Sequence, residues 1–294
     1  IKGLKSLGAT IKISGGYCYA SSPQLVGREV FLGSPFGSSV LGTANLMMAA
    51  VISRGATIID FSACEPELVD LARVLKKMGA DIRGEGTPQI MVRGKKKVGG
   101  FTHRIIPDRI EAGTFMVCAL VTGGSVTIEN MPATFAGAMI DALKNMGQRL
   151  ELKGSNIYVK RNRRIAPTNI TTLPFPGFPT DLQAQFMVLL SQAQGISIVT
   201  EKVYPDRFMH VPELNRMGAK ISRFGPVAVI EGLKRFSSAE VMASDLRASA
   251  CLVAAGLAAS GKTTVHRLYH LDRGYENFVP KLRALGAQIK RGKE

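Results

Sequence analysis

The chain has 294 residues, of which 46% are hydrophobic and 20% charged, a composition that allows two globular domains and a sizeable core. Its longest apolar stretches, residues 40–53 and 248–259, are too short to span a bilayer, and its four cysteines lack the spacing of a zinc site or a disulfide framework. The formal net charge of +16 favours anionic partners such as nucleic acid, acidic lipid or phosphorylated metabolites. The densest basic runs, residues 95–97 and 160–164, have no interleaved aromatic residues, so solvated turns are expected there.

One short phrase recurs five times: Leu or Met, then Gly, then two variable residues, then Ile or Leu. The glycines of the phrase are 71, 68, 71 and 68 residues apart, and they are Gly8, Gly79, Gly147, Gly218 and Gly286. A fixed period indicates one structural unit that is copied in series. Counting back from the C-terminus gives four whole units and the tail of a fifth, so the chain is expected to be a fragment that opens inside a unit.

Each unit follows the same order along the chain. A helix with few charges is predicted first, at residues 39–53, 110–121, 182–194 and 246–260. After a Gly-bearing turn comes a β-branched strand, predicted at residues 56–60, 125–128, 196–199 and 263–265. An amphipathic helix then ends at the repeated Gly, which suits the left-handed residue that closes a helix. In most copies two further strands complete the unit.

This alternation of strands and helices predicts an α/β fold with parallel strands. The first helix of each unit is apolar on most faces and is therefore expected to be buried, whereas the second has a charged face that suits contact with solvent.

Three of the predicted buried helices begin at an aspartate, namely Asp108, Asp181 and Asp245. Aspartate is a good N-cap because its carboxylate accepts hydrogen bonds from the free N–H groups of the first turn. The same positions also suit a site, since the positive ends of helix dipoles attract an anionic substrate. The sequence leaves both interpretations open.

Residues 256–263 fit the phosphate-loop pattern of nucleotide hydrolases, Gly-x-x-x-x-Gly-Lys-Thr. That loop needs a strand before it and a helix after it, so that its N–H groups surround the phosphates. Here a predicted helix precedes the pattern and a predicted strand follows it, so a nucleotide-hydrolase site is not expected.

Four longer motifs carry a resemblance to a known family: residues 178–186 (FPTDLQAQF), 207–219 (RFMHVPELNRMGA), 245–250 (DLRASA) and 269–276 (YHLDRGYE). Together they resemble the UDP-N-acetylglucosamine enolpyruvyl (1-carboxyvinyl) transferases. The resemblance implies an inside-out α/β barrel of two domains, each with three βαβαββ units around buried helices. Residues 1–106 would be the incomplete remainder of the first, cysteine-loop domain, and residues 107–294 the second domain with three complete units.

The resemblance also implies a reaction. The enolpyruvyl group of phosphoenolpyruvate is transferred to the 3-hydroxyl of UDP-N-acetylglucosamine by addition and elimination, and phosphate is released. This is the first committed step of peptidoglycan precursor synthesis. No metal or organic cofactor is implied, and a cytoplasmic monomer without nucleic-acid or membrane partners is expected.

Catalytic roles transfer by motif. Asp181 matches the candidate general base beside the sugar hydroxyl, and Asp245 matches a second acid near the reacting carbons. Arg207 and Arg247 match residues that hold the carboxylate of phosphoenolpyruvate, and Arg273 matches one that holds its phosphate. Arginine suits these roles because its planar fork binds such oxyanions through two hydrogen bonds.

Further substrate contacts also follow from the resemblance. The positions that match a nucleotide-contacting loop at a helix start are Gly37, Ser38, Ser39 and Val40. Val203 matches another substrate contact. The positions that match an interdomain cluster are Glu65, Asp108 and Arg109.

One departure from the family affects activity. The family's Gly-Gly-Cys loop with its following arginine, and its early Lys-Asn pair, have no counterpart in these residues; both normally lie before the point where this chain starts. The chain alone is therefore expected to bind UDP-N-acetylglucosamine weakly and to be inactive. Two alternatives remain: a shikimate-pathway enolpyruvyl transferase, whose own signatures are missing, and a non-catalytic anion-binding relative, which would have no physical need for the arginines and Asp181.

Overall fold

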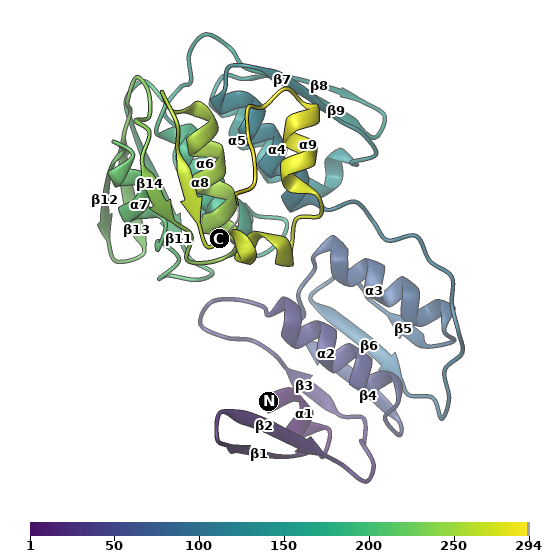
Figure 1. Ribbon diagram of the computed structural model, residues 1–294. Coiled ribbons are helices and arrows are strands. Elements are labelled where there is room, and N and C mark those ends of the chain that lie inside the picture. The colour runs from purple at the N-terminus through teal and green to yellow at the C-terminus, as the bar shows by residue number, and fades with distance from the viewer. Residues whose placement is uncertain (293–294) are drawn as a thin grey trace. The chain divides into compact units, whose positions relative to one another are not determined.

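The computed structural model describes residues 1–292, whose contacts divide the chain into two units (Figure 1). Unit 1 consists of Ile1–Ile106 with Pro174–Pro176, and unit 2 of Pro107–Leu173 with the chain from Gly177 onward. The sequence placed residues 174–176 in the second domain, but they pack within unit 1. There Phe175 N–H donates to Glu65 Oε1 over 3.4 Å, and a Cβ added to Gly37 would lie only 2.8 Å from Pro174 Cγ.

Unit 1 holds a four-stranded sheet in the order β3-β4-β6-β5, covered by helices. Its elements are α1 (Lys2–Ser6), β1 (Thr10–Ser14), β2 (Tyr17–Ser21), β3 (Glu29–Phe31), α2 (Val40–Val51), β4 (Ala56–Asp60), α3 (Pro66–Lys77), β5 (Asp81–Arg83) and β6 (Gln89–Arg93). The register places Ile59 beside both Val30 and Ile90, all three buried. These side chains form a core with the apolar face of α2.

Strands β1 and β2 form a separate two-stranded hairpin in unit 1. Within the described residues each strand pairs only with the other, so their outer edges carry backbone groups without a ladder partner. Their side chains are mostly exposed, and Ile13, Tyr17 and Tyr19 are 67%, 70% and 58% accessible to solvent.

Unit 2 contains three copies of the repeat. Its elements are α4 (Arg109–Val121), β7 (Ser125–Ile128), η1 (Ala133–Phe135), α5 (Gly137–Asn145), β8 (Arg149–Lys153), β9 (Asn156–Lys160), β10 (Ile170–Thr172), η2 (Thr180–Leu182), α6 (Gln183–Leu190), β11 (Ile196–Glu201), α7 (Val211–Arg216), β12 (Lys220–Phe224), β13 (Val227–Glu231), β14 (Glu240–Met242), α8 (Leu246–Ala258), β15 (Thr264–His266), η3 (Leu268–Arg273) and α9 (Phe278–Ala284).

The first helices of the three copies, α4, α6 and α8, pack against one another in the centre of unit 2 (Figure 1). All eight side chains of α6 are buried, as the apolar pattern of its sequence predicts. A small residue also lets α4 lie close to the neighbouring elements η2 and α5. A Cβ added to Gly113 of α4 would lie 2.5 Å from Leu182 Cδ1 and 2.6 Å from Met139 Sδ.

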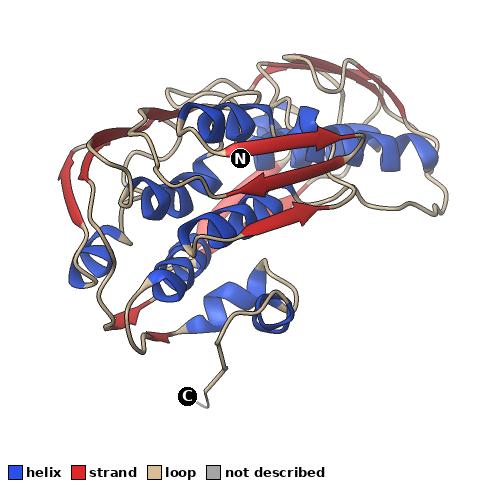
Figure 2. Ribbon diagram, turned by 90° about the horizontal axis from the view of Figure 1, so that it is seen from above, coloured by secondary structure: helices blue, strands red, loops and turns tan. Residues whose placement is uncertain are grey.

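Three sheets surround the central helices, in the orders β7-β9-β8, β10-β11-β13-β12 and β14-β15. The prediction of parallel strands was wrong for most pairs. Only β3 with β4, β10 with β11 and β14 with β15 are parallel, and the other described pairs are antiparallel. The reason is that the strand after α3, α5 and α7 turns back as a hairpin, and the second strand of that hairpin pairs with the strand before the helix. Figure 2, with strands in red and helices in blue, shows this mixture of sheets and helices.

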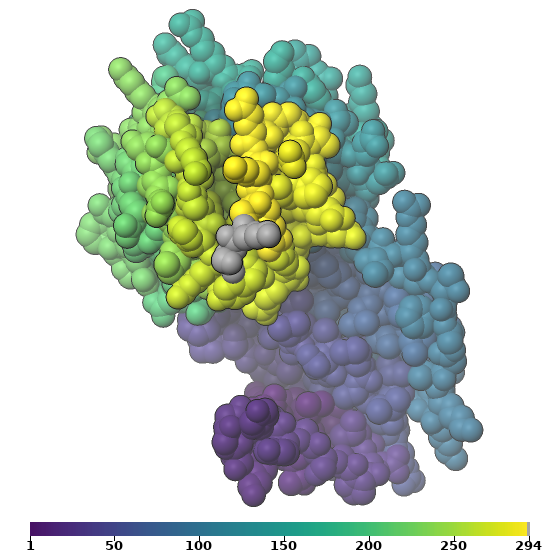
Figure 3. Space-filling model, in the orientation of Figure 1, coloured from purple at the N-terminus to yellow at the C-terminus, as the bar shows by residue number. Residues whose placement is uncertain are grey.

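The repeated glycines behave as predicted. Each follows the end of a helix with a positive φ of 96°, 99°, 73°, 88° or 95°, for Gly8, Gly79, Gly147, Gly218 and Gly286 respectively. The copies are less alike in their strands. Residues 285–292, which follow α9 on the surface of unit 2 (Figure 3), contain no strand, so the third copy lacks the hairpin of the other two.

Among residues 1–292, no helix has both the length and the hydropathy needed to cross a membrane.

Candidate functional site

Three carboxylates lie at the starts of the buried helices of unit 2, and they differ in their hydrogen-bond partners. Asp108 and Asp245 are N-caps: Oδ1 of each accepts hydrogen bonds of 2.7–3.1 Å from two N–H groups of the first helical turn. Asp181 makes no such cap. It lies inside η2, and its side chain faces two arginines instead. The capping interpretation is therefore confirmed for two of the three.

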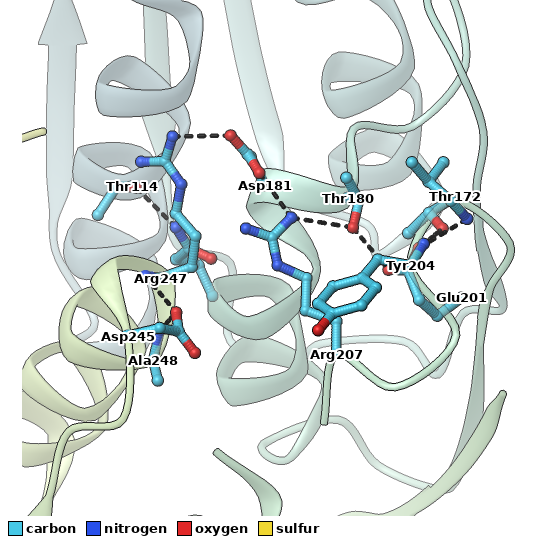
Figure 4. Close-up of polar contacts among 12 residues, drawn as sticks. Thr114, Thr172, Thr180, Asp181, Glu201, Tyr204, Arg207, Asp245, Arg247 and Ala248 are labelled. Carbon is cyan, nitrogen blue, oxygen red and sulfur yellow. Dashed lines mark hydrogen bonds and ion pairs between the residues drawn. The ribbon is translucent and has the colours of Figure 1, made fainter. Parts of the chain in front are cut away.

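Each carboxylate oxygen of Asp181 has its own guanidinium partner (Figure 4). Arg207 Nη1 donates to Oδ1 over 2.6 Å, and Arg247 Nη2 donates to Oδ2 over 2.8 Å. Arg207 comes from the turn before α7, and Arg247 from the first turn of α8, so the second and third copies of the repeat meet here. The Asp181 side chain is 36% exposed, which leaves the group open to a ligand.

Burial acts to raise the pKa of Asp181, but the charges and hydrogen bonds of Arg247 and Arg207 outweigh it and hold this pKa below its ordinary value. Burial likewise acts to lower the pKa of Arg247, and the charge of Asp181 reverses this, so that the pKa of Arg247 is raised. The cluster is thus an ionised carboxylate between two cations, with a net positive charge that suits an anionic ligand.

Tyr275 supports Arg247 from the C-terminal segment. Its hydroxyl lies 3.3 Å from Arg247 Nη1, and its ring centre lies 5.6 Å from the guanidinium carbon. The same hydroxyl contacts Thr114 Oγ1 of α4 at 2.7 Å and Gln185 Nε2 of α6 at 3.3 Å. Arg247 is therefore braced by elements of all three copies. Tyr275 lies within one of the four sequence motifs, but nothing in that motif indicated its partner.

Arg273 is not part of this cluster. It is the last residue of η3 and is exposed, and within residues 1–292 it makes no hydrogen bond or ion pair. Its segment nevertheless lies beside the cluster, because a Cβ added to Gly274 would lie 2.7 Å from Leu246 Cδ2 at the start of α8. Its neighbour Asp272 pairs with Arg291 over 2.5 and 2.8 Å.

Val203 lies in the turn that leads from β11 to Arg207, where its backbone N–H donates to Glu201 Oε1 over 2.9 Å. Glu201 itself is fully buried, and sequence reasoning missed it.

The four residues assigned to the nucleotide loop form the turn at the start of α2 in unit 1: Gly37, Ser38, Ser39 and Val40. Gly37 has φ +97°, and the Ser39 hydroxyl caps the helix by accepting from Gly42 N–H over 3.0 Å. The predicted helix start is thus confirmed. Of the interdomain cluster, Glu65 belongs to unit 1, whereas Asp108 and Arg109 belong to unit 2, so the cluster itself stays a prediction.

The cysteines are free thiols. Cys18 is exposed, Cys64 is partly buried, and Cys118 and Cys251 are buried. Burial raises the pKa of Cys118 to about 12. No group of three or more His, Cys, Asp or Glu side chains in the described part of the chain is placed to hold a metal ion. The phosphate-loop pattern at residues 256–263 joins the end of α8 to β15. This helix-to-strand order is the reverse of the one that a nucleotide-hydrolase phosphate loop needs.

Comparisons with known proteins identify the family. The family profile described as EPSP synthase (3-phosphoshikimate 1-carboxyvinyltransferase) matches residues 1–282. A UDP-N-acetylglucosamine 1-carboxyvinyltransferase of Desulfosudis oleivorans is 50% identical over 291 residues, which are 99% of this chain and 69% of that protein. One of Myxococcus xanthus is 48% identical over 293 residues, which are 100% of this chain and 69% of that protein.

Solved structures agree on the fold. The enolpyruvyl transferase NikO from Streptomyces tendae has a TM-score of 0.87 at 24% identity, over 98% of this chain and 71% of that chain. EPSP synthase from Acinetobacter baumannii has a TM-score of 0.73 at 22% identity, over 99% of this chain and 71% of that chain. The enolpyruvyl transferase fold predicted from the motifs is therefore confirmed. With the whole chain matched at about half identity, this protein belongs to the UDP-N-acetylglucosamine 1-carboxyvinyltransferase family.

Proposed function

We propose that this chain carries the base and the anion-binding arginines for transfer of the enolpyruvyl group from phosphoenolpyruvate to the 3-hydroxyl of UDP-N-acetylglucosamine. Phosphate is the second product, and the reaction is the first committed step of peptidoglycan precursor synthesis. The observation that carries the proposal is the Asp181 carboxylate held between Arg207 and Arg247 within the family's motifs. The names of the relatives support the same acceptor.

The geometry suits general base catalysis by Asp181. Proton removal from a sugar hydroxyl needs an ionised carboxylate within hydrogen-bond reach, and the two arginines keep this one ionised. The hydroxyl oxygen then bonds to C2 of phosphoenolpyruvate as its proton passes to Asp181, while C3 gains a proton from a general acid, which the resemblance places on the family's Gly-Gly-Cys loop, outside these residues. In the elimination C3 gives up one proton to a base and inorganic phosphate leaves C2, which restores the double bond.

Arg207 has N–H donors that are unpaired in residues 1–292 and could bind the carboxylate of phosphoenolpyruvate. Arg207 uses Nη1 for Asp181 and Thr180, and its Nη2 and Nε have no partner within the described residues. A guanidinium offers five N–H donors in a rigid fork and accepts none, so these free donors can bind a carboxylate through two hydrogen bonds. Arg247 is oriented for the same role by Tyr275.

Three further assignments rest on the motifs. Arg273 holds the phosphate, and the exposed position of its side chain beside α8 is compatible with that role. Asp245 fixes the start of α8, and with it Arg247, and shares in proton handling. The motifs also assign nucleotide contacts to the turn at residues 37–40 and to Val203, and a supporting role to Glu65, Asp108 and Arg109. We further propose that the protein works in the cytoplasm, as a monomer and without a cofactor.

Phosphate release from phosphoenolpyruvate and UDP-N-acetylglucosamine tests the proposal. The 294-residue chain lacks the Gly-Gly-Cys loop and is expected to release no phosphate above the blank. A chimera that joins to this chain the N-terminal segment of a family member that has the Gly-Gly-Cys loop is expected to turn over. Turnover by the chain alone, near the rate of that family member, would contradict the expected inactivity.

The variant Asp181→Asn in that chimera is expected to lower kcat by about 10²–10⁴-fold, because the amide cannot take up the proton. Binding of UDP-N-acetylglucosamine by this variant should persist, which separates loss of the base from loss of the fold. If Asp181→Asn keeps the parent's kcat, Asp181 is not the base.

The shikimate-pathway reaction is the second candidate, since the family profile that matches the chain is named after it. Shikimate 3-phosphate in place of the nucleotide sugar is expected to give no phosphate release. A chimera that binds both substrates of the nucleotide-sugar reaction, folds and yet releases no phosphate with either acceptor would favour a non-catalytic anion binder.

A further inference from the structure

Glu201, at the end of β11, is a fully buried carboxylate that no basic side chain neutralises among the described residues. A buried charge is costly unless hydrogen bonds satisfy it. Here four donors do so. Oε1 accepts from Thr172 Oγ1 at 2.6 Å and from the N–H groups of Val203 and Tyr204 at 2.9 Å each, and Oε2 accepts from Thr180 Oγ1 at 2.9 Å.

The direction of the hydrogen bonds around Thr180 is fixed by chemistry (Figure 4). Arg207 Nη1 lies 3.0 Å from Thr180 Oγ1, and a guanidinium can only donate. Thr180 must therefore accept from Arg207, and its single hydroxyl proton is left for Glu201. The same Nη1 also donates to Asp181. A relay thus runs from the proposed substrate-binding arginine through one hydroxyl to one buried carboxylate.

A second connection runs through the backbone. Tyr204 N–H donates to Glu201, and the carbonyl oxygen of Tyr204 accepts from Arg207 N–H over 2.9 Å. The turn that carries Arg207 is therefore anchored at the same carboxylate as its side chain. Thr172 differs in this respect, because its hydroxyl accepts from Lys202 N–H and, among the described residues, makes no hydrogen bond with Arg207.

We propose that Glu201 is a positioning residue which, through Thr180 and the turn at Tyr204, aims Arg207 at the carboxylate of phosphoenolpyruvate. This rests on the proposed function, since Arg207 is taken to bind that substrate. Glu201 itself is buried and touches no substrate. Without its acceptor oxygen, the Thr180 hydroxyl is free to rotate and Arg207 loses a fixed partner.

The test follows the Nε–Hε NMR signal of Arg207 in the 294-residue chain while phosphoenolpyruvate is added, with Arg207→Lys to assign the signal. Glu201→Gln and Thr180→Val are each expected to shift this signal and to raise the Kd for phosphoenolpyruvate about tenfold, the scale of one hydrogen bond to a charged group. Thr180→Ser keeps the hydroxyl and should restore the parent Kd within about twofold.

Thr172→Val is the matched control. It removes a hydroxyl donor from the same carboxylate, and the acceptor of Lys202 N–H, but leaves the Thr180 and Tyr204 links to Arg207 in place. The Kd should therefore change by less than about twofold even where stability falls. The double variant Glu201→Gln/Thr180→Val should bind no more weakly than the weaker single variant, because both changes break one relay.

Additive losses in the double variant, or equal effects of Thr172→Val and Thr180→Val, would overturn the proposal and leave Glu201 a merely structural residue. If the unmodified chain shows no response to phosphoenolpyruvate at Arg207, the proposed function fails instead. The chemical shift of the Arg207 Nε–Hε signal without ligand then tests the positioning role. It should change in Glu201→Gln and Thr180→Val and remain unchanged in Thr172→Val. A signal that stays in all three variants would reject it.

Discussion

His210 illustrates how a single residue in the core can govern the response to acid. It is 2% exposed, and its Nε2 lies 3.2 Å from Met187 Sδ in place of a strong hydrogen-bond partner. Burial lowers its pKa to about 4, with a smaller opposing effect from the charge of Asp245. The folded protein therefore holds this imidazole neutral under conditions in which the unfolded chain protonates it.

The pH dependence of stability follows from this difference. Below about pH 6.5 this histidine binds a proton in the unfolded chain, but it stays neutral in the folded chain until about pH 4. The free energy of unfolding therefore falls by about 3 kcal/mol in all as the pH drops from about 6.5 to 4. Urea unfolding measured across this range checks the expectation. In His210→Asn this part of the slope should vanish, whereas His266→Asn, at a half-exposed histidine, should keep it. Equal slopes in the two variants would contradict this role of His210.

At the residue scale, the motifs predicted Asp181, Arg207 and Arg247 as members of one site, and the structure brings them into contact. They could not predict Glu201 or Tyr275. A glutamate at the end of a strand has the same local sequence whether it is exposed or buried. Its partners come from other segments, so only the folded chain reveals the relay. Nor could the motifs predict that Arg273 makes no hydrogen bond or ion pair within residues 1–292, because a motif match does not say which side chains come within reach in the folded chain.

At the scale of the elements, α4 packs closely against η2 and α5. Gly113 of α4 faces Leu182 and Met139, both only 1% exposed and therefore little able to move aside. Two predicted strands, β4 and β7, have the bounds expected from their flanking glycines, whereas the parallel pairing was wrong. Residue pattern marks where a strand begins, but its pairing depends on which hairpin folds back beside it.

Gly113→Ala is expected to lower the free energy of unfolding by about 1–3 kcal/mol, because the added methyl overpacks the contact between the helices. Gly137→Ala is the matched control, since an added Cβ at the start of α5 would meet nothing within 4 Å. That variant should be neutral or stabilising by up to about 1 kcal/mol. Chemical denaturation of both variants measures the difference, and similar values for the two would reject close packing at Gly113.

At the scale of the whole molecule, the net charge of +16 acts on every anionic ligand that approaches. Both proposed substrates carry phosphate groups, so long-range attraction should assist their binding. Raising the salt concentration from about 0.05 to 0.5 M shortens the screening length several-fold. We expect this to raise the Kd of the 294-residue chain for UDP-N-acetylglucosamine about tenfold. Calorimetric titration provides the measurement.

Uridine, which has no phosphate, is the control ligand, and its Kd should be nearly independent of salt. If the nucleotide sugar were equally insensitive, the positive charge would have no part in substrate binding and would serve solubility alone.

The hairpin of β1 and β2 has a consequence for the behaviour of concentrated solutions. Two strands with open edges, flanked by exposed Ile13, Tyr17 and Tyr19, offer a template on which a strand of another molecule can add. Mutual repulsion between chains of charge +16 opposes that encounter. Salt screens this repulsion but leaves the strand edges open. The high-salt buffer that weakens the attraction of substrates therefore also favours self-association through residues 10–21.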